Sequence, residues 1–297
     1  MARAKVILNP TAGRGEAGRL ADEVSATLQA LGVAHDVTLT RAVGDGATLA
    51  EQAKRDGCAT VIAVGGDGTV SEVVNGLMRA AGDGVGGTLG IIPIGTGNDF
   101  IKMLDVPLDW RQACAKIAAG QTRRVDVGRV NDRFTTNGVG IGFDTLVGIE
   151  SRKITWARGT AVYVIGLART LLLTYRTPRV HIELDGEPIE QDITLISIAN
   201  GRCYGGGFWV CPNAVVDDGL FDVCLARGLN RLQILSLVPQ VMKGTHVDKP
   251  PVRMARARKV VVTSDESLPV HLDGEILGTD LHRVEAEMLA GRLEVIG

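Results

Sequence analysis

The sequence VIAVGGDGTVSE at residues 61–72 joins a short apolar run to a glycine-rich turn and then to a helix-like pattern. The apolar run is β-branched, which is typical of a strand covered on both faces by helices. In the turn, Gly65, Gly66 and Gly68 lack a Cβ, so the backbone can take left-handed angles or let a phosphate approach closely. The pattern predicts a strand, a nucleotide-binding turn and a helix in succession.

The start of this helix is signalled by Thr69 and Glu72, which have the Ser/Thr-x-x-Glu spacing of a capping box. The free amides and the positive dipole end at a helix N-terminus favour an anion. Asp67 adds a carboxylate to the same turn, and a carboxylate there requires a cation or a proton nearby. The combination predicts a site for metal-bound polyphosphate. For the turn alone, a tight strand-to-helix connection without a ligand remains the alternative.

Composition limits the class of protein. The 297 residues are 45% hydrophobic and 22% charged, which is enough for one large or two ordinary domains. A net charge of -2 lacks the basic surplus of typical nucleic-acid-binding proteins, so we expect no nucleic-acid partner. The five cysteines form no Cys-x-x-Cys pair, and neither a signal peptide nor an apolar run of about 18 residues is present. These features predict a cytoplasmic protein with at most transient contact to the inner membrane surface.

The first 125 residues alternate strand-like and helix-like segments. Strands are expected at residues 5–9, 35–39, 60–64 and 89–94, with helices at residues 16–31, 47–55, 70–81 and 108–119. This alternation predicts an α/β domain over residues 1–125, with a parallel sheet flanked by helices on both faces. Since ligands bind at the carboxyl ends of such strands, the loops after the four strands should converge on one edge.

Polar residues or glycines occur in each of these loops. They are Asn9 and Gly13 after the first strand, Thr40 after the second, Asp67 after the third, and Thr96, Asn98 and Asp99 after the fourth. Two carboxylates at a phosphate site, Asp67 and Asp99, suit Mg²⁺-dependent phosphoryl transfer, because the metal neutralises charge as the terminal phosphoryl group moves. A Walker A motif and a dinucleotide-binding Gly-x-Gly-x-x-Gly turn after the first strand are both absent. Individually, each loop is also compatible with a plain turn or helix cap.

The second half of the chain has short strands separated by turn pairs such as Asp185-Gly186. Strands are expected at residues 125–130, 134–138, 179–184, 193–199, 221–226, 259–263 and 270–272, and helices at residues 156–175 and 231–242. This pattern predicts an antiparallel β-sandwich domain over residues 126–287. No Pro-, Ser- or charge-rich linker separates the halves, so we expect the domains to pack closely, with the nucleotide site in the cleft between them.

Three motifs together resemble a known family. They are Gly-Gly-Asp-Gly-Thr at residues 65–69, Asn-Pro-x-x-Gly at residues 9–13 and Gly-Thr-x-Asn-Asp-Phe at residues 95–100. The set resembles the diacylglycerol kinase catalytic domain, whose family includes bacterial lipid kinases and sphingosine kinases, and the resemblance runs nearly end to end. The glycine turn alone is shared with NAD kinases and is similar to that of phosphofructokinases. The loop at residues 95–100 is therefore the sharper marker.

The resemblance implies transfer of the γ-phosphoryl group of ATP to a hydroxyl of diacylglycerol or a related lipid, with Mg²⁺. A soluble small-molecule kinase of the NAD kinase type and a non-catalytic lipid-binding module remain the alternatives. The resemblance also implies that residues 288–297 return to the first domain, where residues 293–296 would add a strand. The oligomeric state stays open, with a homodimer as one candidate.

By matching position, the resemblance assigns further roles. Asp126 would join Asp67 in a metal and water network, with a solvated strand residue as the alternative. Either Asp273 or Glu275 would take the alcohol proton. A plain hairpin turn is the alternative for residues 273–275. A structural Mg²⁺ site is expected at Val215, Asp218 and Leu220, for which a tight turn is the alternative. The predicted nucleotide-site residues are Asn9, Gly13, Thr40, Gly65, Gly66, Asp67, Gly68, Thr69, Glu72, Thr96, Asn98, Asp99 and Asp126, and the predicted catalytic residues are Asp67, Asp273 and Glu275.

Basic residues surround the apolar helix expected near residues 160–173. They are Arg152, Lys153, Arg158, Arg169, Arg176 and Arg179. Such a pattern can rest on anionic headgroups, which would give the enzyme peripheral access to a lipid substrate. The alternative is a helix that packs on the sandwich with solvated ends.

Overall fold

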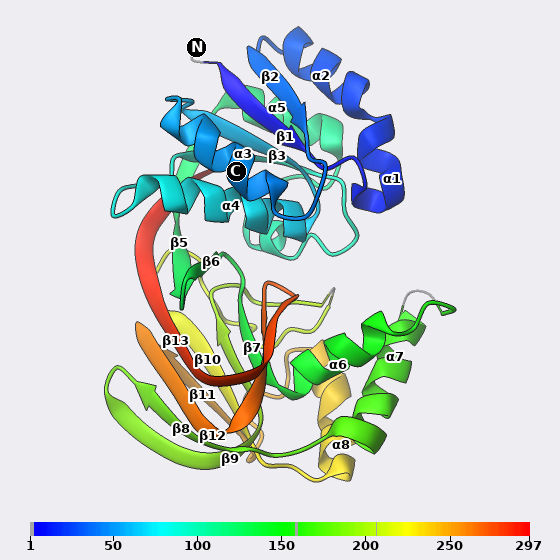
Figure 1. The fold of residues 1–297 in the computed structure, drawn as a ribbon, viewed down its shortest axis with the longest axis vertical. Coiled ribbons are helices and arrows are strands. Elements are labelled where there is room, and N and C mark those ends of the chain that lie inside the picture. Colours follow the sequence, from blue (N-terminus) through cyan, green and yellow to red (C-terminus); the bar gives the residue numbers. More distant parts are fainter. Residues whose placement is uncertain (1–2, 158–159, 206) are drawn as a thin grey trace.

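A computed structural model of the chain describes residues 3–157, 160–205 and 207–297. It consists of an N-terminal α/β domain and a C-terminal domain built mostly of strands, which lie one above the other in Figure 1. Two strands, β5 (Thr122–Val130) and the long β13 (Glu275–Ile296), run between the domains. The two-domain architecture expected from the sequence is present.

The N-terminal domain contains the expected parallel sheet. Its strands are β1 (Ala4–Leu8), β2 (His35–Leu39), β3 (Thr60–Gly65) and β4 (Thr88–Pro93). They pair in parallel in the order β2-β1-β3-β4. The order reverses between β1 and β3, and open α/β sheets bind their ligands beyond the strand ends at such a point.

Helices cover both faces of this sheet. On one face, α2 (Ala21–Ala30) and α5 (Trp110–Ala119) pack in a core with β1 and β3, while α3 (Asp45–Arg55) and α4 (Asp67–Ala81) cover the other face. The single helix expected over residues 16–31 is wrong. The chain forms α1 (Ala12–Arg19) and then α2, with left-handed angles at residues 13–15 inside α1. These left-handed residues precede residue 16, and the break within the expected helix lies at Leu20, which is both the C-cap of α1 and the N-cap of α2.

The C-terminal domain is the expected sandwich-like antiparallel arrangement. Its strands are β6 (Arg133–Thr135), β7 (Gly138–Gly142), β8 (Arg179–Leu184), β9 (Glu187–Ala199), β10 (Phe221–Arg227), β11 (Val252–Ala257) and β12 (Lys259–Leu272). The long strands β9 and β12 each pair with β8 along one part of their length and with β7 along another. The strands of this domain therefore form one hydrogen-bonded sheet that folds over on itself. A single apolar core fills the space between its layers.

Two strand predictions in this domain need correction. The strand expected over residues 134–138 is divided between β6 and β7, because the amide of Asn137 donates to Asp273 and takes no part in a strand ladder. The strands expected at residues 259–263 and 270–272 are one strand, β12, whose pairing with β13 is irregular between them.

The last strand connects the two domains. β13 begins at Glu275, immediately after the turn at Asp273, and pairs with β12. Its end pairs in parallel with β4, where Glu294 and Val295 lie opposite Thr88 and Leu89. The strand added to the first sheet, which was expected at residues 293–296, is therefore present. One strand thus joins the turn of the second domain to the sheet of the first.

Three helices gather on one side of the C-terminal domain (Figure 1). They are α6 (Phe143–Arg152), α7 (Thr160–Arg169), which continues as a π-helical turn (Thr170–Thr174), and α8 (Arg231–Met242). Apolar side chains at 171, 229, 234 and 237 pack these helices together. Arg158, one of the predicted basic residues, lies outside the described residues. In the described ranges, none of the helices has both the length and the apolar character needed to span a bilayer.

Candidate active site

The loops after the four parallel strands meet at one edge of the sheet, as expected. The amide of Asn9 Nδ2 donates to Thr69 Oγ1 over 3.2 Å, which ties the first loop to the third. The amide of Thr40 donates to the carbonyl of Leu8 over 2.9 Å. Gly13 packs so closely that an added Cβ would lie 3.1 Å from the Ile94 side chain, beside the fourth loop. These contacts bring the ends of the four strands and the loops that follow them to the same edge.

The glycines of the turn allow close approach between loops. Gly65, Gly66 and Gly68 all lie outside the positive-φ region, so left-handed geometry is not the reason for them. A Cβ on Gly65 would overlap Thr69, and a Cβ on Gly95 would lie 2.6 Å from the Cα of Gly66. A Cβ on Gly68 would meet only Glu275 Oε1, at 3.5 Å. The turn therefore presents bare backbone at the start of α4.

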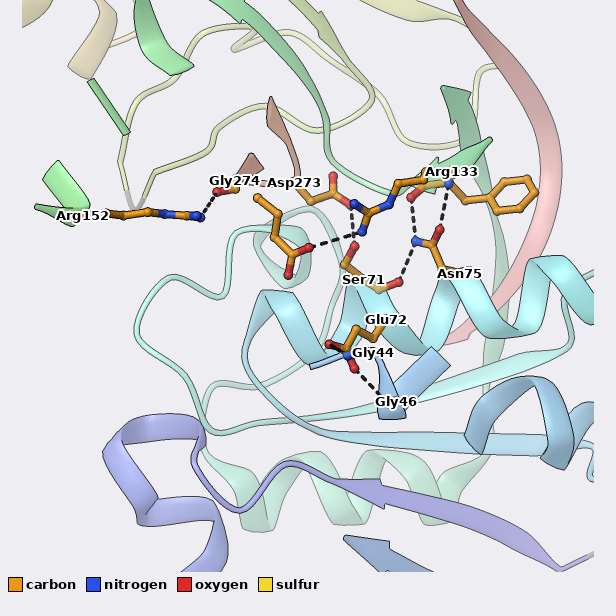
Figure 2. Close-up of polar contacts among 11 residues, drawn as sticks. Gly44, Gly46, Ser71, Glu72, Asn75, Arg133, Arg152, Asp273 and Gly274 are labelled. Carbon is orange, nitrogen blue, oxygen red and sulfur yellow. Dashed lines mark hydrogen bonds and ion pairs between the residues drawn. The ribbon is translucent and has the colours of Figure 1, made fainter. Parts of the chain in front are cut away.

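The predicted capping box of Thr69 and Glu72 is wrong. Helix α4 begins at Asp67, with Gly66 as N-cap and no side-chain cap bond. The carboxylate of Glu72 instead accepts hydrogen bonds from the amides of Gly44 (2.8 Å) and Gly46 (2.9 Å), at the start of α3 (Figure 2). A carboxylate at a helix N-terminus is favoured by the helix dipole. Glu72 therefore fixes α3 beside the turn, and its predicted contact with the nucleotide stays a prediction.

Asp67 is anchored through one oxygen. Its Oδ1 accepts hydrogen bonds from the amides of Asp99 (2.7 Å) and Phe100 (3.3 Å). Burial raises the pKa of Asp67, and the charge of Asp99 raises it further. Its Oδ2 lies against Gly97, where an added Cβ would be 2.7 Å away. Within the described part of the chain, Oδ2 accepts no hydrogen bond, so this oxygen can bind a cation.

Asp99 is buried beside Asp67 and has its own basic neighbour. Lys102 Nζ lies 2.6 Å from Asp99 Oδ1, across the short 3₁₀ turn Phe100–Met103. The thiol of Cys203, from the second domain, lies 3.9 Å from the same oxygen, and burial raises the pKa of this thiol to about 11. Lys102 was not predicted from the sequence. Its position three residues after an aspartate, on the same side of a helical turn, was the available signal.

Asp273 lies in a left-handed hairpin turn, with φ of 49° at Asp273 and 84° at Gly274. Its Oδ2 accepts a hydrogen bond from Ser71 Oγ of α4 over 3.2 Å. Its Oδ1 accepts three hydrogen bonds, from the Thr135 hydroxyl and from the amides of Asn137 (3.1 Å) and Gly138 (3.0 Å). Asp273 therefore links the turn to both domains.

Glu275, two residues later, is less constrained. Its side chain is 35% exposed and one carboxylate oxygen pairs with Arg133 Nη2 at 3.3 Å, while the other faces Gly68 of the glycine turn. Nearby, Asn75 of α4 donates to the Phe134 carbonyl and accepts from the Phe134 amide. The sequence analysis missed Ser71, Arg133 and Asn75. The polar run at residues 135–137 interrupts a strand pattern, and this interruption could have indicated that the segment lies at a site and not inside a sheet.

Asp126 lies in a different cluster. It is buried, which raises its pKa, and its two oxygens accept hydrogen bonds from the amides of Gly219 (2.6 Å) and Gly291 (2.7 Å). The neighbouring Asp218 accepts from the Leu220 amide over 3.1 Å and pairs with Arg256. The network role of Asp126 and the magnesium site at Val215, Asp218 and Leu220 stay predictions.

Two family models match the chain in succession. Residues 3–130 match the model described as the diacylglycerol kinase catalytic domain. Residues 137–297 match the model described as the YegS C-terminal NAD kinase beta sandwich-like domain. The matches coincide with the α/β domain and with the sandwich-like domain, respectively.

Relatives and a solved structure agree with these models. A diacylglycerol kinase of Mycobacterium tuberculosis (strain CDC 1551 / Oshkosh) is 35% identical over 91% of this chain and 87% of its own length. One of Bacillus subtilis (strain 168) is 30% identical over 94% and 91%. A crystal structure of a diacylglycerol kinase from Bacillus anthracis str. Sterne superposes with a TM-score of 0.76 at 26% identity, covering 99% of this chain and 96% of that one. The chain therefore belongs to the diacylglycerol kinase family of lipid kinases.

Proposed function

We propose that the protein transfers the γ-phosphoryl group of ATP to a hydroxyl of diacylglycerol or a closely related lipid, with Mg²⁺. One observation carries the proposal beyond family membership. The turn at residues 273–275 packs against the start of α4, where Asp273 contacts Ser71 and Glu275 faces Gly68. A group that can accept the alcohol proton thus adjoins the backbone that would bind the phosphates.

The phosphates would bind the amides of the glycine turn. Helix N-termini favour anions, and Gly68 at the start of α4 has open backbone. Asn9, Gly13, Thr40, Thr96 and Asn98 lie in the loops of the same edge and would contact the rest of the nucleotide. Domain packing over this edge would place the nucleotide between the domains.

Asp67 and Asp99 fit a magnesium ion. They are close enough for the charge of Asp99 to raise the pKa of Asp67, and Oδ2 of Asp67 is available. Mg²⁺ is usually bound through one or two carboxylates and completed by phosphate oxygens and water. The described residues contain no group of three or more His, Cys, Asp or Glu side chains that could hold a metal ion. When bound, Mg²⁺ would offset charge on the transferred phosphoryl group.

The other acidic residues would act from further away. Asp126 matches the family position for a metal network, but both of its oxygens accept backbone amides, so we expect it mainly to hold the loops of Gly219 and Gly291. Val215, Asp218 and Leu220 would hold a second, structural Mg²⁺. Asp218 is already paired with Arg256, so a metal ion at this site must compete with that arginine. Both assignments rest on matching position in the family.

Glu275 is the better candidate for the general base. The Oδ1 of Asp273 already accepts three hydrogen bonds and its Oδ2 accepts one from Ser71, which leaves little capacity for an alcohol proton. The carboxylate of Glu275 is partly exposed and faces the glycine turn. Glu275 would take the proton from the lipid hydroxyl as the new bond forms. Asp273 would hold the turn against α4.

The helices of the second domain supply a surface for the lipid. Exposed apolar side chains follow α7, the π-helical turn and α8, with Leu172 75% and Leu232 78% exposed. Exposed basic residues lie alongside them, namely Arg152, Lys153, Arg169 and Arg176. An apolar surface next to cations suits the interface of an anionic bilayer. We expect the enzyme to meet its acceptor there, at the cytoplasmic face of the inner membrane.

The decisive experiment follows labelled phosphate from ATP into a panel of lipids in mixed micelles and into NAD, with the wild type and Asp67→Ala. We expect transfer to a diacylglycerol-like lipid by the wild type and none by the variant. Transfer only to NAD, or an active Asp67→Ala, would overturn the proposal.

Replacing Leu172 and Leu232 by serine should weaken binding to anionic vesicles without changing the melting temperature. Unchanged vesicle binding would exclude this surface as the membrane contact.

A further inference from the structure

Helix α6 contacts the chain around Asp273 at both of its ends. Arg152, its last residue, donates from Nη2 to the carbonyl of Gly274 over 2.9 Å (Figure 2). Asp144, in its first turn, lies 2.9 Å from His271 Nε2, on β12 just before the turn. We propose that α6 is a brace for this turn, and that Arg152 is a positioning residue for Glu275. The inference rests on the proposed function, in which Glu275 accepts the alcohol proton.

The dimensions of the two segments support a two-point brace. Asp144 and Arg152 are separated by eight helical residues, or about 12 Å at 1.5 Å per residue. His271 and Gly274 are separated by three residues, which span at most about 10 Å. Because the chain turns at Asp273 and Gly274, the two contact points on it lie closer together than the ends of α6, and the long side chain of Arg152 reaches across the difference. One rigid helix can hold both points at once.

The Gly274 side of the turn, unlike Asp273, has no side chain that could anchor it. A Cβ on Gly274 would meet no atom within 4 Å, so in the described structure this part of the turn is not packed. The carbonyl of Gly274 and the amide of Glu275 belong to one planar peptide group. A donor that fixes the carbonyl oxygen therefore fixes the direction in which Glu275 leaves the turn. Arg133 then holds the far end of the Glu275 side chain.

The brace is itself held firmly in the domain. Asp144 also accepts a hydrogen bond from the hydroxyl of Tyr204 over 2.7 Å, and the Tyr204 ring packs edge-on against His271 at 5.1 Å. Burial raises the pKa of Tyr204 well above its usual value, so its hydroxyl stays a donor. Gly140 on β7 makes room for this cluster, because a Cβ there would overlap both Asp144 and His271.

The other end of α6 is attached to α7. The carboxylate of Glu150 is buried and pairs with Lys153 (2.6 Å) and Arg169 (2.8 Å). These pairs lower the pKa of Glu150, which keeps it charged. Contacts of Asp144 at one end of α6 and of Glu150 near the other hold the helix in place. Arg152 at its end is therefore held in a defined position.

The test compares Arg152→Ala and Arg152→Lys with a matched control, Arg292→Ala. Arg292 also donates to turn carbonyls, those of Gly82 and Gly84, both over 2.6 Å, but these lie at the far end of α4. The acceptor is dihexanoylglycerol below its micelle concentration, so that no lipid surface contributes. We expect Arg152→Ala to lower kcat about tenfold, equivalent to about 1.4 kcal/mol, without changing KM for ATP. Arg152→Lys should recover most of this loss, because an ammonium group can donate to the same carbonyl.

Hydrogen–deuterium exchange gives a readout that does not depend on activity. Amides of residues 270–278 should exchange faster in Arg152→Ala than in the wild type, while Arg292→Ala should match the wild type at an unchanged melting temperature. Unchanged exchange, a loss confined to KM for the lipid, or an Arg152→Lys as slow as the alanine variant would overturn the inference. A wild type that phosphorylates no lipid would overturn the proposed function, and exchange would still decide whether Arg152 braces the turn.

Discussion

Asp67 and Asp126 are both carboxylates whose pKa is raised first of all by burial, yet they are held in opposite ways. Asp67 uses one oxygen to accept two backbone amides, and within the described residues its other oxygen has no donor. Asp126 uses each oxygen to accept one amide, from loops far apart in the sequence. A carboxylate with both oxygens engaged stabilises the loops around it. A carboxylate with one oxygen left over is available for a ligand.

The same distinction separates Asp273 from Glu275 in the second domain. Asp273 accepts hydrogen bonds on both oxygens, whereas Glu275 has one basic partner and is partly exposed. The two regions thus each contain one structural and one available carboxylate. The molecule brings the available members, Asp67 and Glu275, to the two sides of Gly68. This division gives separate expectations for activity and for stability.

The largest effect should come from Asp67→Asn. Loss of the available charged oxygen removes a metal ligand next to the phosphates, and we expect kcat to fall about 10³-fold, as for loss of strong electrostatic stabilisation. Steady-state kinetics in mixed micelles, with circular dichroism to confirm folding, would measure it. A variant that keeps more than a tenth of the wild-type kcat would contradict the role of Asp67. Such a result would also mean that Asp67, like Asp126, is a structural carboxylate and not one available for a ligand.

Glu275→Gln should have the next largest effect. Removal of a general base typically costs 10²–10⁴-fold, and we expect a loss of kcat of about 10²-fold with little change in the free energy of unfolding. Asp273→Asn is the matched comparison, because that substitution should destabilise the turn through its lost hydrogen bonds. If Glu275→Gln remains fully active while Asp273→Asn is inactive and stable, the roles of the two carboxylates are reversed.

Asp126→Asn should affect stability more than catalysis. An asparagine side chain has one acceptor oxygen, so its NH₂ group would face the amide of either Gly219 or Gly291. Leaving a buried donor unsatisfied costs about 1–3 kcal/mol, and we expect a loss of this size in urea denaturation. The kcat of the folded variant should stay within about threefold of the wild type. A large loss of kcat without a loss of stability would support the metal network predicted for Asp126.

Much of the fold follows from local sequence patterns. The parallel strands and the turn pairs Asn131-Asp132, Asp185-Gly186 and Asp273-Gly274 were predictable, because apolar periodicity and left-handed turn residues are local signals. The prediction of a capping box at Thr69 was wrong because it, too, relied on a local pattern alone. The pattern was present, but tertiary partners at Asn9 and Gly44 took up both side chains. A local motif cannot report a competing contact from another element.

The candidate site was predictable only in part. The loops after the parallel strands could be placed, because strand order in an α/β sheet brings their ends together. Ser71 and Arg152 could not, since their partners lie 202 and 122 residues away in the sequence. The position of β13, which carries the turn back to β4, depends on the same long-range pairing. Family resemblance indicated the residues of the turn, but their hydrogen bonds distinguish Asp273 from Glu275.

The smallest effect concerns the pH dependence of stability. Burial raises the folded-state pKa of Asp67 above 3.8, the usual value of an aspartate, so its stabilising contribution is fully present below that pH and is lost as pH rises through the folded pKa. Urea denaturation would measure the difference in unfolding free energy between the wild type and Asp67→Asn. This difference should become less favourable to the wild type as the pH rises from 4 to 7.5. At neutral pH the inactive variant should be at least as stable as the wild type, because its neutral amide removes a buried charge beside Asp99. Asp126→Asn should show a slope of the same sign, because burial raises the pKa of Asp126 as well, and yet be less stable than the wild type, since it loses a hydrogen bond in addition to a charge. A flat difference for Asp67→Asn would mean that its charge is not penalised in the folded protein, and the contrast between the two carboxylates would then rest on hydrogen bonding alone.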